Sequence, residues 1–249
     1  MSAKKLLKNG IIAAFWALVW LLLARRVDSE LLLPGPGLVL ATLWALVKTA
    51  AFWQSVALSM LRIVAGVAAA VTLGTLLAVV TERFSALRSL LSPALTVVKS
   101  TPVASFIILA LVWMGRDVLP GFIALLMVLP VVWSNVSTGI AQTDPQLLEM
   151  ARVFGFGPMK RLTKLYIPSV MPYFLSACRG SLGLGWKAGI AAEVLTLPGV
   201  SIGKRLYESK LYLETPQLFA WTLVVILLSL GMEKLLLAVL PKAERTVGK

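Results

Sequence analysis

Three charged residues lie inside one long apolar stretch of the sequence and are candidates for electrostatic chemistry. Arg179, Lys187 and Glu193 are spaced along residues 169–195. If this stretch is a membrane-spanning helix that rises about 1.5 Å per residue from the cytoplasmic side, Arg179 lies in its inner, cytoplasmic half. Glu193 then lies near its outer end. Ionised groups in such a helix are costly unless they face a bundle interior or a wet cavity. We therefore expect Lys187, past the middle, to attract an anion.

A structural ion pair would explain Lys187 equally well. Its partner would be a carboxylate, such as Glu193 of a neighbouring subunit. For Arg179 we favour a structural role, because it lies nearest the expected inner vestibule.

Weaker candidates for a polar pathway come from two other apolar stretches. Residues 99–102 (KSTP) interrupt one of them and free backbone groups, so Ser100, Thr101 and Ser105 could line a pathway there. A simple packing kink is equally compatible with this break. In the other stretch, we expect Asn135 to make a helix–helix hydrogen bond rather than to contact a solute.

The chain lacks a usable phosphate-binding loop. The nearest sequence, GSLGLGWK over residues 180–187, has Trp186 before the lysine and no preceding strand, so we expect Gly185 and Gly189 to serve helix packing. With no His and a single Cys178, we expect no metal site, no disulfide and no cofactor bound by this chain. We expect no enzyme activity, because without a phosphate-binding loop the chain cannot hydrolyse ATP alone. The energy for any work that it does must therefore come from a partner protein or an ion gradient.

Composition places these residues in a membrane protein. The chain is 59% hydrophobic and 14% charged, with a mean hydropathy of +0.89. Soluble domains carry about 25% charged residues. The net charge is +13, but the basic residues lie between apolar segments rather than on one face with aromatic residues. This pattern favours anionic membrane lipid over nucleic acid as a partner.

Six apolar segments predict an all-α membrane protein with both termini on one side. The expected spans cover residues 6–24, 55–80, 93–115, 122–140, 169–195 and 219–240. In the second span, Gly66, Ala70, Gly74 and Ala78 recur every four residues and form a smooth ridge for close helix packing.

The segments between the spans complete the predicted topology. We expect residues 31–50 to be interfacial on the outer side, residues 81–92 to be a short polar connection, and residues 196–216 to form an outer loop. With the termini inside, the inner segments hold twelve Lys and Arg residues and the outer segments hold seven. The excess favours both termini in the cytoplasm.

Residues 144–168, DPQLLEMARVFGFGPMKRLTKLYIP, form a long polar run between two apolar spans. Asp144 is a good N-cap for a short helix, and Gly155 can close that helix in a left-handed conformation. Gly157 and Pro158 then turn the chain before a second, basic helix, and Pro168 is expected to end the unit. The charge distribution places this unit in the cytoplasm.

This unit resembles the cytoplasmic signature of permease subunits of importers driven by an ATP-binding cassette. That signature reads Glu-Ala-Ala, three residues, Gly, nine residues, Ile-x-Leu-Pro. Here residues 149–151 (EMA) are followed by Gly155 at the family spacing, and residues 165–168 (LYIP) close the motif. Met150, Leu165 and Ile167 depart from the pattern conservatively.

Three further stretches, SVALSMLRIVAGVAAAVTLGTLLA, STPVASFIILALVWMG and GWKAGIAAEVL, are similar to the nitrate, sulfonate and taurine branch of these permeases. That branch also carries thiamine pyrimidine precursors and other small organic solutes. The resemblance implies a type I importer fold in a bacterial inner membrane and a small, anionic solute as cargo. It also implies a second permease copy, an extracytoplasmic substrate-binding protein, and an ATPase subunit that binds ATP and Mg²⁺.

The resemblance also implies that residues 144–168 are a coupling unit that contacts the ATPase. A helix capped at Asp144 can present Leu147, Leu148, Met150 and Ala151 as an apolar ridge to a cleft. Small Ala151 allows close approach, and Glu149 is within reach of Arg152. The expected coupling residues are Asp144, Leu147, Leu148, Glu149, Ala151, Arg152, Gly155, Gly157 and Pro168.

We interpret residues 1–249 as a single permease domain. Residues 1–54 would hold the first span and the interfacial segment, residues 55–240 the core, and residues 241–249 a cytoplasmic tail. A gradient-driven secondary transporter is the main rival, but we find none of the inverted repeats usual in that class. A membrane scaffold is the other rival, and it would not need a docking helix with this spacing.

Overall fold

Every regular element in the described part of the chain is helical. The computed structural model describes the backbone of residues 3–247 and the side chains of residues 10–12, 14–236 and 238. In chain order the elements are α1 (Ala3–Val27), α2 (Pro36–Val47), α3 (Ala50–Arg83), α4 (Ser85–Ser100), α5 (Val103–Ala110), α6 (Leu119–Ala141), α7 (Pro145–Val153), α8 (Pro158–Arg161), the π-helix η1 (Leu162–Tyr166), α9 (Ile167–Thr196), α10 (Ile202–Leu211) and α11 (Thr215–Val247). The all-α prediction is confirmed.

Four helices are long and apolar enough to cross a membrane. They contain Gly10–Val27, Ala50–Arg83, Leu119–Ala141 and Thr215–Leu236, and the bent pair α4 and α5 makes a fifth if it counts as one span. Helix α9 has 30 residues, but its three charges lower its hydropathy and it is not among these spans. The count of six spans therefore stays a prediction.

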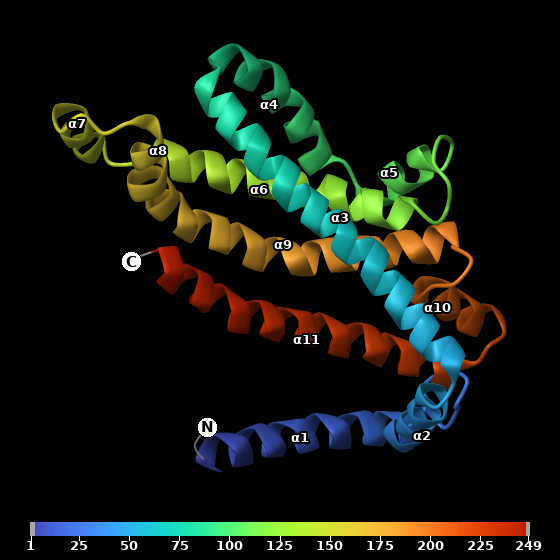
Figure 1. Ribbon diagram of the computed structural model, residues 1–249. Helices are drawn as coiled ribbons and strands as arrows, with labels where there is room; N and C mark the ends of the chain where they lie inside the picture. Colours follow the sequence, from blue (N-terminus) through green and yellow to red (C-terminus); the bar gives the residue numbers. More distant parts are fainter. Residues whose placement is uncertain (1–2, 248–249) are drawn as a thin grey trace.

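The long helices lie side by side and place the connections at opposite ends (Figure 1). Both ends of the described chain lie on the same side as α7, whereas α2, α10 and the start of α6 lie on the other side. This arrangement is compatible with the predicted topology. Residues 248–249 of the expected tail lie outside the described residues, and the rest of that tail, up to Val247, continues α11.

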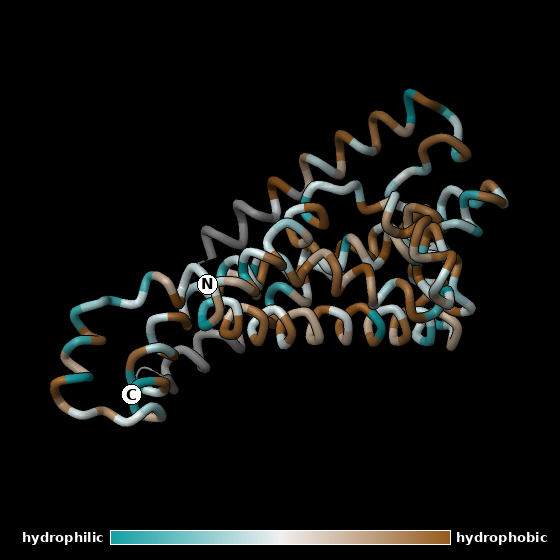
Figure 2. Tube along the Cα trace, turned by 90° about the horizontal axis from the view of Figure 1, so that it is seen from above, coloured by the Kyte–Doolittle hydropathy of each residue, from teal (hydrophilic) through white to brown (hydrophobic). Residues whose placement is uncertain are grey.

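Helix α6 is the centre of the packing and contacts α3 and α9 more extensively than any other pair of elements meets. Its residues Val128 and Val132 belong to one hydrophobic core with Trp186 of α9 and Trp221 of α11. Figure 2 shows hydrophobic residues along the lengths of the long helices.

Glycines allow α3 to approach α6 closely. A Cβ atom built on Gly66 would collide with the backbone oxygen of Gly121, and one built on Gly74 would lie 3.0 Å from Cβ of Val132. Gly66, Ala70, Gly74 and Ala78 are all buried. The ridge predicted on this helix is confirmed. Likewise, Cβ atoms on Gly185 and Gly189 of α9 would meet side chains of α3 at 2.5 Å, as expected for packing glycines.

The expected polar connection over residues 81–92 is wrong. Helix α3 continues to Arg83 and α4 begins at Ser85, so Phe84 alone separates them. Leu87, Leu91, Leu95 and Val98 recur at helical spacing on the less exposed face of α4, and this periodicity outweighs the polar residues between them.

The expected third span over residues 93–115 is also wrong as a single helix. Pro93 lies inside α4, and the chain bends by 104° between α4 and α5. The break lies at residues 101–102, so the interruption predicted from the KSTP sequence is confirmed. The outer loop over residues 196–216 contains α10, which the sequence did not predict.

We predict that Gly66→Ala destabilises the protein by about 2 kcal/mol, because overpacking at a close backbone contact typically costs 1–3 kcal/mol. Gly231→Ala is the matched control, because nothing lies within 4 Å of a Cβ atom at that exposed helical position. Both variants should be compared by reversible unfolding in detergent. Equal stability of the two variants would contradict the close α3–α6 contact.

Candidate functional site

Helix α7 and the turn after it project beyond the ends of the long helices (Figure 1). The helix begins as predicted, because a carboxylate oxygen of Asp144 accepts a hydrogen bond from the N–H of Gln146 at 2.8 Å. Pro145 occupies the first helical turn. The amino-terminal cap is therefore determined locally by these residues.

The predicted left-handed closure of α7 at Gly155 is confirmed. Gly155 has φ +64°. The N–H of Phe156 donates to the carbonyl of Ala151 at 2.8 Å, and the N–H of Gly155 donates to that of Arg152 at 3.1 Å. These two bonds form a Schellman motif, which fixes the sharp exit from the helix. The ammonium of Lys160 lies 4.1 Å from the ring centroid of Phe156 and packs the next turn against this exit.

The apolar ridge of α7 differs from the predicted one. Ala151 is fully buried and cannot contact a partner as expected, and Leu148 is half-buried. Four apolar side chains are instead exposed on one face, namely Leu147, Met150, Val153 and Phe154. We call these four residues the α7 ridge. Val153 is 84% exposed and Phe154 is 71% exposed, which marks this surface as available for docking.

The remaining coupling candidates lie at the polar edge and base of the unit. Glu149 and Arg152 are exposed, and neither takes part in an ion pair among the described residues. Gly157 is exposed and precedes α8 with φ −65°, which any residue can adopt.

Pro168 does not end the unit, contrary to the prediction. The chain is helical from Pro158 through η1 into α9 without a break. In η1 the N–H of Ile167 donates to the carbonyl of Leu162, five residues earlier. Because proline has no N–H, this wider turn lets the helix continue through Pro168. The predicted coupling unit is thereby joined directly to the helix that carries Arg179, Lys187 and Glu193.

Lys187 lies on the exposed face of α9. Apart from Ile167 and Arg179, the exposed positions along this helix follow one stripe, Pro172, Ser176, Gly180, Leu184, Lys187, Ala191 and Leu195. We call these seven residues the α9 stripe. No ion pair of Lys187 is present among the described residues, and Glu193 of the same chain pairs with Arg62 at 3.9 Å. A cation on this face is compatible with a pathway for anions.

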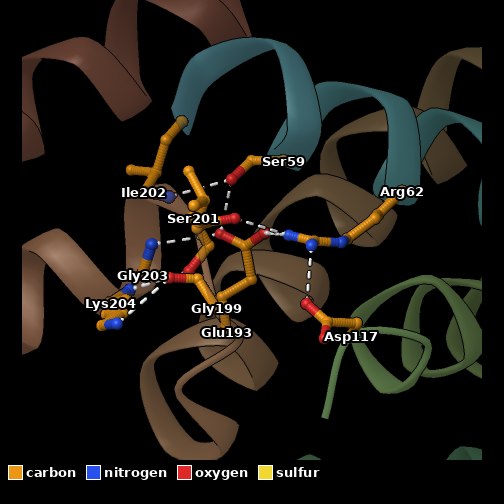
Figure 3. Close-up of polar contacts among 10 residues, drawn as sticks. Ser59, Arg62, Asp117, Glu193, Gly199, Ser201, Ile202, Gly203 and Lys204 are labelled. Carbon is orange, nitrogen blue, oxygen red and sulfur yellow. Dashed lines mark hydrogen bonds and ion pairs between the residues drawn. The ribbon is translucent and has the colours of Figure 1, made fainter. Parts of the chain in front are cut away.

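Glu193 is fully buried and does not line an open surface in this chain. One carboxylate oxygen, Oε2, accepts a hydrogen bond from the hydroxyl of Ser59 at 2.8 Å and another from the N–H of Gly203 at 3.1 Å. Figure 3 shows this cluster. Its contacts are those of a structural residue.

Arg179 lines a pocket of about 120 Å³ between α9 and α11, together with Leu182, Gly183, Ser229, Met232 and Glu233. The guanidinium is exposed on the side of α9 that faces α11. Arg179 takes part in no ion pair among the described residues, so the structural role that we favoured for it stays a prediction.

The weaker pathway candidates mostly bond to their own helices. Ser100 and Thr101 donate to carbonyls of Thr96 and Val97 in α4, at 2.5 and 2.8 Å, and Ser105 is exposed at the start of α5. The amide nitrogen of Asn135 donates to a carbonyl four residues earlier in α6, at 2.8 Å, so the expected helix–helix hydrogen bond is not the one found.

The sequence analysis did not identify two sets of residues that belong to the candidate sites. Val153 and Phe154 continue the helical spacing of Leu147 and Met150, so the helical period already placed them on the α7 ridge. Arg62 is a lone charge in the second apolar span, and that isolation was the signal for a buried partner.

The chain belongs to the binding-protein-dependent transport system inner membrane components, whose family model matches residues 70–244. It is therefore a permease component of an ATP-binding cassette transport system rather than an enzyme.

Several named permease proteins are similar to this chain. A Bacillus subtilis (strain 168) protein named as a transport permease for aliphatic sulfonates is 26% identical over 89% of this chain and 79% of its own length. The taurine transport system permease protein of Escherichia coli (strain K12) is 24% identical over 78% of this chain and 73% of its own length. A bicarbonate transport system permease protein of Synechococcus elongatus is 27% identical over 64% of this chain and 57% of its own length.

We predict that Gly155→Ala loosens the exit of α7, because a residue with a Cβ atom at positive φ costs about 1–2 kcal/mol. Amide exchange at residues 154–156 should accelerate by about tenfold in the full chain. Gly157→Ala is the matched control, because both glycines have open space around a built Cβ atom and only Gly155 has a positive φ. Equal exchange in the two variants would contradict this explanation.

Proposed function

We propose that this chain forms the translocation pathway for a small anionic solute in an ATP-driven importer of a bacterial inner membrane. The observation that carries the proposal is the projecting α7 ridge, which a short turn joins to the continuous helix that begins at Pro158 and bears Lys187. An ATPase subunit would bind the ridge and would supply the energy, with ATP and Mg²⁺ held on that subunit.

The α7 ridge fits a helix-in-groove interface. Leu147, Met150, Val153 and Phe154 supply the apolar anchors, and the Schellman motif fixes the angle at which the helix meets its partner. Arg152, Lys160 and Lys164 are exposed on α7, α8 and η1, and this excess of positive charge on the unit favours a cleft with an acidic rim. The orientation with α7 and both termini in the cytoplasm is part of this proposal.

The α9 stripe supports a pathway between two copies of the chain. Ser176, Gly180 and Ala191 are small and leave room for a second backbone or for a solute beside Lys187. The stripe lies between the face of α9 that packs on α5 and the face that packs on α11. A second copy would cover it and exclude lipid from the lysine.

The solute is proposed to be an anion because Lys187 lacks an ion-pair partner among the described residues. Relatives named for sulfonates, taurine and bicarbonate support this class of cargo. An extracytoplasmic binding protein would deliver the solute at the side that holds α10. ATP binding would draw two ATPases together, and the α7 helices would transmit that motion as rigid-body rocking of the spans.

A thermal-shift screen of the partner binding protein against sulfonates, nitrate, bicarbonate and pyrimidines would identify the cargo class. An anion should give the largest shift. A neutral or cationic preferred ligand would contradict the role proposed for Lys187.

We predict that Val153→Asp weakens binding of the ATPase subunit at least tenfold, because a central interface contact is typically worth about 2 kcal/mol or more. Co-purification of the ATPase with the full chain and ATP-dependent uptake in vesicles should fall together. Leu211→Asp is the matched control for ATPase binding, because Leu211 is also an exposed apolar residue but ends α10, which lies on the opposite side of the protein. ATPase binding that survives Val153→Asp would place the docking site elsewhere.

We predict that Lys187→Gln raises the KM for uptake of an anionic solute by roughly tenfold, because contacts to a charged group contribute about 1.5–3 kcal/mol. ATPase binding should remain unchanged, since Lys187 is remote in sequence from the α7 ridge. Lys234→Gln removes a lysine from α11 and is the control. An unchanged KM in the Lys187 variant would favour the structural alternative for this residue.

A further inference from the structure

A polar cluster ties four elements together on the side of the protein opposite α7. It consists of Ser59 and Arg62 of α3, Asp117 of the connection between α5 and α6, Glu193 of α9, and the first residues of α10. We call it the outer cluster, and Figure 3 shows its contacts. Ser59 and Glu193 form its buried half, whereas Asp117, at the other end of the cluster, is exposed.

The buried half holds α10 in place. The hydroxyl of Ser59 donates to Oε2 of Glu193 at 2.8 Å and accepts from the N–H of Ile202 at 2.9 Å, while the N–H of Gly203 donates to the same Oε2. A Cβ atom on Gly203 would collide with Glu193, so α10 lies directly on α9. The carboxylate also faces the positive end of the α10 dipole.

One oxygen of this buried carboxylate is left over. Oε1 of Glu193 has no hydrogen-bond partner among the described residues, although the side chain is fully buried. An unsatisfied buried charged group is costly, so an unpaired oxygen here requires an explanation. The nearest cation is Nη1 of Arg62 at 3.9 Å, which is outside hydrogen-bond range.

Arg62 is held away from that oxygen by two partners, one half-buried and one exposed. Its Nη1 donates to the carbonyl of Val200 at 2.8 Å, and its Nη2 donates to Asp117 at 2.7 Å. The Asp117 side chain is 63% exposed, and the connection around it carries exposed apolar residues such as Val112 and Trp113. Because the Asp117 end of this ion pair is exposed, water can compete there for the carboxylate.

We propose that Arg62 is the moving part of a latch with two positions. In the first position it binds Asp117 and holds the α5–α6 connection against α3. When that connection moves outward, Arg62 turns onto the free Oε1 of Glu193, so the carboxylate stays paired and α10 stays anchored. The latch lets one outer segment move while its neighbour remains fixed, and it rests on the proposed transport cycle, which requires the outer side to open.

The direct test is a structure of the full-length Asp117→Asn variant in lipid nanodiscs. Removing the charge of Asp117 leaves the Val200 carbonyl as the remaining partner of Arg62, and the guanidinium should then move to within about 2.9 Å of Oε1 of Glu193, the stronger acceptor. Glu214→Gln removes an exposed acid from the same side and should leave Arg62 in place. An Arg62 that stays at its present distance from Glu193 in Asp117→Asn, or that turns to solvent, would overturn the latch.

Amide exchange in the same variants gives an independent readout. Asp117→Asn should accelerate exchange at residues 111–118 by about tenfold and leave Ile202 and Gly203 unchanged, whereas Glu193→Gln should accelerate exchange at Ile202 and Gly203. Faster exchange at both places in Asp117→Asn would show a static structural pair and overturn the proposal. Neither readout involves the ATPase or the solute, so failure of the latch and failure of the transport proposal remain distinguishable.

Discussion

Close backbone contact between α3 and α6 is the constraint on which the rest of the structure depends. Helices in lipid gain little from apolar contact, because lipid tails are as apolar as the side chains. Tight packing must hold them together instead, and Gly66 and Gly121 bring the two backbones within direct contact. Helix α6 then packs its other side on α9. Helices α3, α6 and α9 thus form one packed layer, and this layer positions the α7 ridge and the α9 stripe.

Helix α9 connects the features that bear on function. The coupling unit is joined to the start of α9 through η1. Lys187 lies past the middle of α9, and Glu193 lies near its other end, beside α10. A displacement of α7 can therefore reach the outer side through one continuous helix. The buried half of the outer cluster joins α10 to that helix, because the N–H of Gly203 donates to Glu193.

Local chemistry explains which parts of the coupling unit could be predicted. Asp144 caps α7 and Gly155 closes it because each effect needs only a few neighbouring residues. The predictions for Pro168 and Ala151 failed for non-local reasons. Proline stops a helix only if the freed carbonyl finds no other donor, and η1 supplies a wider turn. Ala151 is apolar and small, which suits a buried position as well as a docking surface, and only packing against the rest of the protein distinguishes the two.

The sequence by itself determined the helical class, the helix caps, the packing ridge on α3 and the break between α4 and α5. Each of these follows from the period of apolar residues, from glycine and proline, or from a cap within one turn. The tertiary structure decided that Glu193 is buried between α3 and α10, and that Lys187 lies on an exposed stripe. Ser59 and Glu193 are 134 residues apart in the chain. Such a pair forms only when helix packing brings the residues together, which no local pattern specifies.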